Sequence, residues 1–158
     1  MSSFALYLSG SDNEVGSAGV GAEQPVGTHV EMRIDRAFRF GGRVELRSQD
    51  PAHVGSGTTR TPWWAYTVAV AMESKKGQFR IVATTQPFDE KFPLREWWEP
   101  GDTPFRGTVL FGDDEWDART VCTDVLVAKQ IFKDFLDHGE LTEASFCQMR
   151  SYYDPKPI

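Results

Sequence analysis

The stretch that decides the fold is TDVLVAKQIFKDFLDHG, residues 123–139. Its apolar side chains recur with the 3.6-residue period of an amphipathic helix. They are Ala128, Ile131, Phe132, Phe135 and Leu136. Acidic Asp124 suits the positive start of a helix, and Gly139 can end the helix in the left-handed conformation. The sequence therefore predicts a helix from about Thr123 or Asp124 to His138, with one apolar face that must pack against another layer.

A second amphipathic helix is predicted nearer the start of the chain. Thr28 and Glu31 have the spacing of a capping box, so the helix is expected to begin at Thr28. Gly41 and Gly42 provide a stop, because glycine readily adopts the left-handed conformation that ends helices. The apolar stripe of this helix consists of Val30, Ile34, Ala37 and Phe38.

Several shorter runs have the composition and alternation of strands. Residues 64–73 and 78–85 are joined by Ser-Lys-Lys-Gly, which is typical of a hairpin. One face of the first run carries the small residues Ala69 and Ala71, on which a helix could lie closely. Further strands are predicted at 4–8, 43–48 and 107–111, and a single helical turn is predicted at 93–98, where proline takes the first position.

These elements predict a single α+β domain over residues 1–158. We expect a mostly antiparallel sheet of about five or six strands, with the two amphipathic helices packed against it. Residues 9–27 and 49–62 are predicted to be long loops, and 154–158 an exposed tail. The segment 141–153 is compatible with either a short helix or a last strand.

Composition favours a stable, soluble domain. The chain has 158 residues, of which 40% are apolar and 13% aromatic, so it can build one core without disulfides. The five-residue apolar segment 4–8 is too short for a signal peptide or a membrane span. Cys122 and Cys147 are the only cysteines and form no Cys-x-x-Cys pair. We therefore expect reduced thiols, a cytoplasmic location and no membrane partner.

The net charge of −6 argues against a nucleic-acid partner, which would require a clustered cationic face. Its distribution is uneven. In residues 112–143, nine acidic and three basic residues leave −6, whereas the rest of the chain is neutral. The predicted turn after strand 107–111 contains four of these acids, Asp113, Asp114, Glu115 and Asp117.

Catalytic and metal-binding readings are weaker than a binding role. His29, His53 and His138 lack the spacing that places two metal ligands on one helix face, so no metal or cofactor is expected. Cys122 precedes a helix start that could lower its pKa, but small cysteines are common in cores and no histidine is near it in sequence. The acidic turn could serve a small hydrolase or transferase together with Arg60 or His53, and we keep that alternative open.

Two segments carry a family resemblance. Residues 108–117, a strand followed by an acidic turn with an aromatic, and residues 127–141, a helix ending in Phe-Leu-Asp-His-Gly-Glu-Leu, resemble bacterial immunity proteins of the Imm1 kind. The last third is also similar to a family of uncharacterised bacterial proteins. The resemblance to immunity proteins implies that the chain binds a toxin delivered by neighbouring bacteria, in the cytosol, and blocks its active site.

The partner is therefore expected to be a protein, namely a cationic toxin domain. A negative surface would attract such a partner and select against others. Tryptophans could supply the apolar anchors of the interface, although each could equally pack in the core. The predicted partner-binding residues are Asp113, Asp114, Glu115, Trp116, Asp117, Trp97 and Trp98. Exposed tryptophans would also fit a third alternative, an orphan subunit of a larger assembly.

Overall fold

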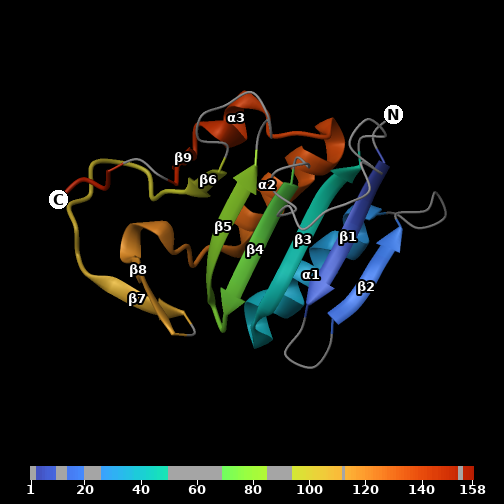
Figure 1. The fold of residues 1–158 in the computed structure, drawn as a ribbon, viewed down its shortest axis with the longest axis horizontal. Coiled ribbons are helices and arrows are strands. Elements are labelled where there is room, and N and C mark those ends of the chain that lie inside the picture. Colours follow the sequence, from blue (N-terminus) through green and yellow to red (C-terminus); the bar gives the residue numbers. More distant parts are fainter. Residues whose placement is uncertain are drawn as a thin grey trace, which may run out of the picture.

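A computed structural model describes residues 3–9, 14–19, 26–49, 69–84, 94–111, 113–152 and 155–158. Its centre is an antiparallel sheet of seven strands in the order β2-β1-β3-β4-β5-β6-β9 (Figure 1). The strands are β1 (Ser3–Ser9), β2 (Glu14–Gly19), β3 (Gly42–Gln49), β4 (Ala69–Lys75), β5 (Gln78–Thr84), β6 (Leu94–Trp97) and β9 (Met149–Ser151). A separate two-stranded sheet consists of β7 (Thr108–Phe111) and β8 (Asp114–Asp117). The predicted α+β class with a mostly antiparallel sheet is confirmed.

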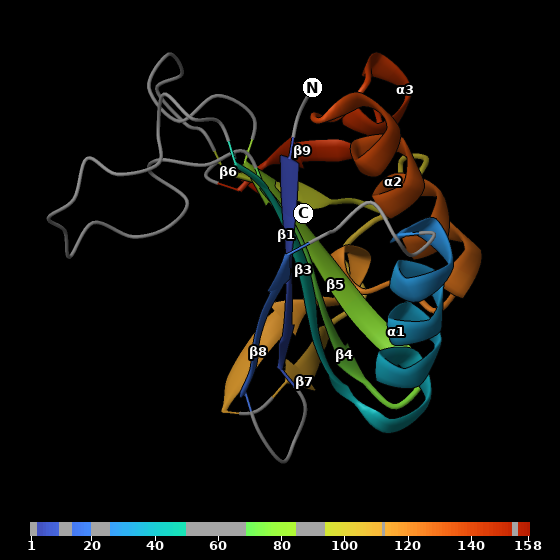
Figure 2. The ribbon, with the colours of Figure 1, turned by 90° about the vertical axis from the view of Figure 1, so that its right-hand side faces the viewer.

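The two long helices lie together on one face of the large sheet (Figure 2). They are α1 (Val26–Phe40) and α2 (Val125–His138), and the short helix α3 (Glu143–Phe146) follows α2. A three-residue 3-10 helix, η2 (Ala118–Thr120), leads from the small sheet towards α2. Among the described residues, no helix is both long and apolar enough to cross a membrane.

The core forms between the helices and the sheet. Ile131, Phe132 and Phe135 of α2 are fully buried, as the helical period predicts. They pack in one cluster with Val70 and Met72 of β4. The prediction that a helix lies on the face of Ala69 and Ala71 was therefore wrong. Because larger side chains bury more apolar area, the helices cover the face of Val70 and Met72, and the small Ala69 and Ala71 are buried on the opposite face.

Helix α2 begins and ends as its sequence predicts. The Asp124 carboxylate accepts a hydrogen bond from the Leu126 N–H at 3.0 Å, and Gly139 ends the helix with φ 76°. Helix α1 differs from the prediction at its start. It begins at Val26, so Thr28 lies inside the first turn, whereas a capping box needs its threonine at the non-helical position before the helix.

Two local predictions fail because pairing with a neighbouring strand decides the structure. Residues 9–27 were predicted to be a loop, yet they include β2, which pairs with β1 in spite of its glycine and serine content. Residues 93–98 were predicted to form a helical turn, yet β6 is a strand paired with β5 and β9. The predicted loop 49–62 lies outside the described residues, except that Gln49 ends β3.

The ambiguous segment 141–153 contains both of the structures considered for it, α3 and β9. Asp134 of α2 fixes the start of α3. Its Oδ2 accepts hydrogen bonds from the Thr142 N–H at 3.1 Å, the Thr142 hydroxyl at 2.6 Å and the Ser145 hydroxyl at 2.7 Å. Burial acts to raise the pKa of Asp134, but these hydrogen bonds to the charged form outweigh it and hold the pKa below its ordinary value.

The core prediction is tested on α2. Replacing Phe132 with Ala is expected to lower the free energy of unfolding by about 3–5 kcal/mol, as for other large buried aromatics. Leu126 of the same helix is 67% exposed and provides the matched control, since its replacement by Ala should change stability by less than about 0.5 kcal/mol. Urea denaturation measures both, and a loss under about 1 kcal/mol for Phe132→Ala would contradict the orientation of the helix.

Asp134 generates a prediction about pH. Because its folded-state pKa is lowered, its stabilising contribution is present above the ordinary value of 3.8 and is lost as pH falls through the folded-state pKa. Asp134→Ala should therefore be less stable than wild type at pH 7, and the difference should shrink below pH 3.8. Denaturant titrations between neutral and acid pH measure it; a difference that stays constant would disprove the assignment.

Candidate functional site

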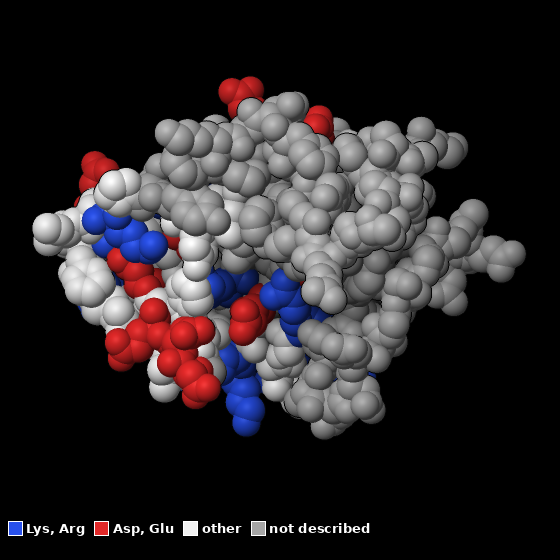
Figure 3. All heavy atoms as spheres, viewed as in Figure 1, with Lys and Arg blue, Asp and Glu red and all other residues white. Residues whose placement is uncertain are grey.

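The predicted acidic turn is the tip and second strand of the β7–β8 hairpin. The sequence placed all four acids in a turn, but Asp114, Glu115 and Asp117 belong to β8, which pairs with β7 from Phe111↔Asp114 to Thr108↔Asp117. Asp113, Asp114 and Glu115 are exposed, and none of them forms an ion pair within the described part of the chain. Figure 3 shows acidic side chains gathered over this hairpin.

Asp117, in contrast, is buried and paired with Arg119. Its carboxylate accepts two hydrogen bonds from the guanidinium, from Nε at 3.0 Å and from Nη2 at 2.8 Å. It also accepts one from the Arg119 N–H, which caps η2. The hydrogen bonds from Arg119 lower the pKa of Asp117 against the opposing effect of burial. The prediction that Asp117 contacts a partner directly is therefore not supported, because the residue is 8% exposed and both of its carboxylate oxygens accept hydrogen bonds from Arg119.

Trp116 packs against the same part of the large sheet. The Arg80 guanidinium carbon lies 3.5 Å from the centre of its ring, which is a close cation–π contact. The ring of Tyr152 meets it edge-on at 6.2 Å between centroids. Trp116 is half-buried, so its indole fixes the hairpin to the sheet and leaves only part of its surface to a partner.

The two remaining predicted tryptophans have structural positions. Trp97 is 5% exposed and belongs to the core, so it offers no surface to a partner. Trp98 is half-buried between two guanidinium groups, with Arg119 at 4.7 Å and Arg150 at 4.3 Å from its ring centre. Both predictions of direct contact therefore lose support, and core packing, which was the alternative for each tryptophan, accounts for Trp97.

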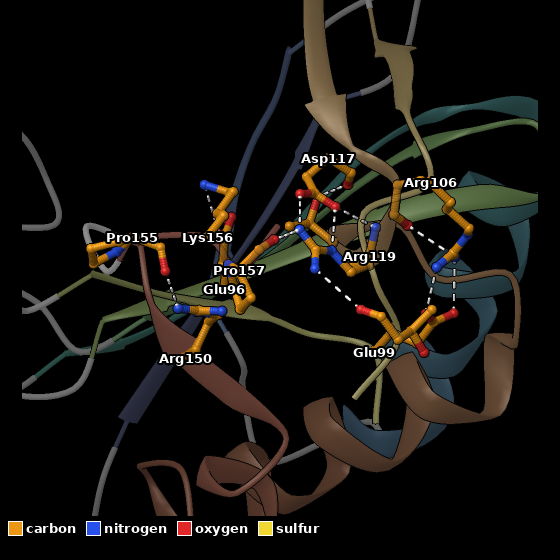
Figure 4. Close-up of polar contacts among 12 residues, drawn as sticks. Glu96, Glu99, Arg106, Asp117, Arg119, Arg150, Pro155, Lys156 and Pro157 are labelled. Carbon is orange, nitrogen blue, oxygen red and sulfur yellow. Dashed lines mark hydrogen bonds and ion pairs between the residues drawn. The ribbon is translucent and has the colours of Figure 1, made fainter. Parts of the chain in front are cut away.

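The structure also assembles a charged cluster that the sequence did not indicate (Figure 4). The Arg80 Nη2 and the Glu96 Oε2 form an ion pair at 2.9 Å, with both side chains at least 95% buried. Lys156 approaches the other oxygen of Glu96 at 3.6 Å. Burial raises the pKa of Glu96 and lowers that of Arg80, because both charges lie away from water. Alternation along β5 places Arg80 on the face opposite the helices, and this is the one signal that could have predicted it.

Other acids of the 112–143 segment have local structural roles. Asp124 caps α2, Asp134 fixes α3, and Asp137 pairs with Lys133 at 2.7 Å. The acidic side chains of this segment therefore do not form one continuous binding surface. Among the described residues of this segment, three exposed acids without an ion pair lie together on one element. They are Asp113, Asp114 and Glu115 of the hairpin.

The other residues considered for catalysis have surroundings that do not favour a catalytic role. Cys122 is 4% exposed, and burial raises the pKa of its thiol, which disfavours the thiolate that a nucleophile requires. The ring Nδ1 of His138 lies 2.9 Å from the Asp134 carbonyl at the end of α2. His53 and Arg60 lie outside the described residues. Within the described parts of the chain, no three His, Cys, Asp or Glu side chains converge as metal ligands would.

Together, the fold and this surface define an α+β domain that presents an acidic hairpin beside a buried arginine–carboxylate cluster. The chain belongs to a family of unknown function, DUF6911, whose model matches residues 65–145. This match includes the central strands, the hairpin and α2. No curated protein and no solved structure matches the chain.

The two classes of acid on the hairpin give opposite predictions for stability. Asp117→Ala removes the hydrogen-bonded partner of Arg119 and should lower the free energy of unfolding by about 2–3 kcal/mol. Asp113 is exposed in the turn between β7 and β8, so Asp113→Ala should change the free energy of unfolding by less than about 0.5 kcal/mol. Thermal and urea denaturation compare them, and equal effects would contradict the distinction between buried and exposed acids.

Proposed function

We propose that this protein is an immunity-type module that binds and neutralises a cationic toxin domain through the β7–β8 hairpin. The observation that carries the proposal is the exposure of Asp113, Asp114 and Glu115 on one hairpin, where none of them forms an ion pair with a described residue. Three unpaired carboxylates at a hairpin tip contribute little to folding. They create a local negative potential that attracts and orients a positively charged partner.

The hairpin is held rigidly enough to serve as an interface. Asp117 and Arg119 fix the end of β8, and the Ala118 N–H donates to the Gly107 carbonyl at 3.0 Å, which closes the base of the hairpin. Lys75 of β4 donates from Nζ to the Leu110 carbonyl at 2.9 Å. Because these contacts order the backbone before any partner arrives, less conformational entropy is lost on binding.

Apolar side chains beside the acids can supply the anchors that were first assigned to tryptophans. Leu110 is 50% exposed and lies opposite Glu115 in the hairpin register. Phe105, just before β7, is 49% exposed. An interface with apolar groups at its centre and charged groups at its rim is the usual anatomy of protein–protein recognition. Leu110 and Phe105 thus replace Trp97 and Trp98 in the proposed contact surface.

The resemblance of residues 108–117 and 127–141 to immunity proteins, which includes the acidic turn, supports the same function. It implies a cytosolic encounter with a toxin delivered by neighbouring bacteria, and the acidic charge of the hairpin favours a toxin whose substrate-binding cleft is cationic. A cytoplasmic location is part of this proposal, and so is inhibition by covering the cleft of the toxin.

The two alternatives receive less support. For a hydrolase or transferase, Asp117 is engaged by Arg119, so it is not free to transfer protons. For an orphan subunit, exposed tryptophans were the motive, yet Trp97, Trp98 and Trp116 are buried or half-buried. The observations therefore favour the binding module.

Charge reversal of the hairpin tests the proposal. The variant with Asp113, Asp114 and Glu115 all replaced by Lys should lose capture of the partner that wild type retrieves from the native strain. Asp117 stays unchanged, because its replacement would disrupt Arg119. The captured partner should be toxic when it is expressed alone in bacteria, and co-expression of wild type should restore growth whereas the reversed variant should not.

The matched control reverses three exposed acids away from the hairpin, Glu31 of α1, Glu140 between α2 and α3, and Glu143 of α3, which changes the net charge by the same amount. This control should still capture the partner and restore growth. If both reversed variants lose the partner equally, net charge and not the hairpin decides binding. If the hairpin variant still protects cells, the proposed interface is wrong.

A further inference from the structure

Residues 155–157 of the chain lie against a strip of side chains, here called the groove, which is formed by Glu96, Arg119 and Arg150 (Figure 4). Two guanidinium groups bind the backbone of this segment. Arg150 donates from Nη2 to the Pro155 carbonyl at 2.7 Å, and Arg119 donates from Nη2 to the Pro157 carbonyl. Between these two anchors, the Lys156 ammonium lies 3.6 Å from the Glu96 carboxylate.

The groove is built from fixed groups. Arg119 is 1% exposed and is held by Asp117 and by the Thr103 carbonyl, which accepts from Nη1 at 3.1 Å. Arg119 and Arg150 both stack on the ring of Trp98. Glu96 is 1% exposed and is oriented by Arg80 through its other oxygen. These donors and this acceptor are therefore also held by contacts that do not involve residues 155–157.

The segment that covers the groove is, in contrast, exposed, and it is bound through its two proline carbonyls and the Lys156 ammonium. Residues 155–158 are exposed, and the Lys156 side chain retains 36% of its surface in solvent. Among the described residues, none donates a hydrogen bond to the buried Glu96 Oε1, because Lys156 stops at 3.6 Å, beyond hydrogen-bonding distance. A buried carboxylate oxygen without a donor is costly, so a closer ammonium would be favoured there.

We propose that this groove is a binding site for an extended, lysine-containing peptide segment of a protein partner, and that residues 155–157 hold its place in the free chain. Arg150 and Arg119 bind the carbonyls of residues i and i+2, so the site selects a segment whose extended backbone brings both carbonyls to the two guanidinium groups. Prolines favour that conformation and have no backbone N–H to leave unpaired. The buried Glu96 carboxylate, with the Tyr152 ring 5.9 Å from the ammonium, selects a cationic side chain between the two carbonyls.

This inference does not rest on the acidic hairpin, since its ligand is defined by the groove alone. The test uses the full chain with P155G, K156G and P157G, which frees the groove without shortening the protein. The probe is the fluorescent peptide Asp-Pro-Lys-Pro-Ile, the sequence of residues 154–158. A tethered segment competes at an effective concentration in the millimolar range, so the variant should bind the peptide at least about tenfold more tightly than wild type.

Two controls separate recognition from loose association. A peptide with norleucine in place of lysine keeps the apolar stem but lacks the ammonium, and it should bind the variant about tenfold more weakly. Adding Arg150→Ala to the variant removes one carbonyl donor without touching the buried Arg80–Glu96 pair, and it should weaken the lysine peptide by a similar factor. Circular dichroism checks that each variant is folded, and Lys156→Ala replaces the glycine variant if that one is not.

Fluorescence polarisation gives the affinities. Equal binding by wild type and variant, or equal binding of the lysine and norleucine peptides, would overturn the proposal. Sedimentation of wild type distinguishes the source of the natural ligand, because a dimer that the free lysine peptide dissociates would show that a second copy of this chain, and not another protein, supplies the segment.

Discussion

The guanidinium of Arg119 is the interaction on which the functional surface depends. It binds Asp117 at the end of β8, two residues away, and joins this end to more distant parts of the chain, namely the carbonyls of Thr103 and Pro157 and the face of Trp98. An arginine that is 1% exposed must have its donors satisfied, because a buried and unpaired charge is very costly. Its environment therefore fixes the base of the hairpin and one end of the peptide groove at once.

The sheet and helices form the support for this arrangement. One face of the sheet is covered by α1 and α2 and is wholly apolar at its centre, whereas the other carries Arg80 and Glu96 among small residues such as Ala69 and Ala71. Small side chains leave room for long charged ones to lie flat on the sheet and pair with each other. The stable core and the polar surface are thus produced by the same strands, through the alternation of side chains between two faces.

Features that depend on local periodicity could be predicted from the sequence, whereas features that depend on pairing between residues far apart in the chain could not. Helix α2 was correct at both ends because Asp124 and Gly139 act within one turn. Strand β2 was missed because its partner β1, not its own composition, orders it. At the site, the acids of the hairpin were found from composition, but a linear sequence could not show that Asp117 differs from Asp113 by pairing with a buried arginine.

The acids of one hairpin have two roles. Asp117 stabilises the fold, whereas the exposed acids are free to attract a partner. The most direct measurement is the association rate constant of the captured partner with wild type at increasing ionic strength. Exposed carboxylates that steer a cationic partner predict a rate that falls steeply as the Debye length shortens from about 10 Å at 0.1 M salt, with little change in the dissociation rate. An association rate that is independent of salt would contradict recognition through the hairpin acids.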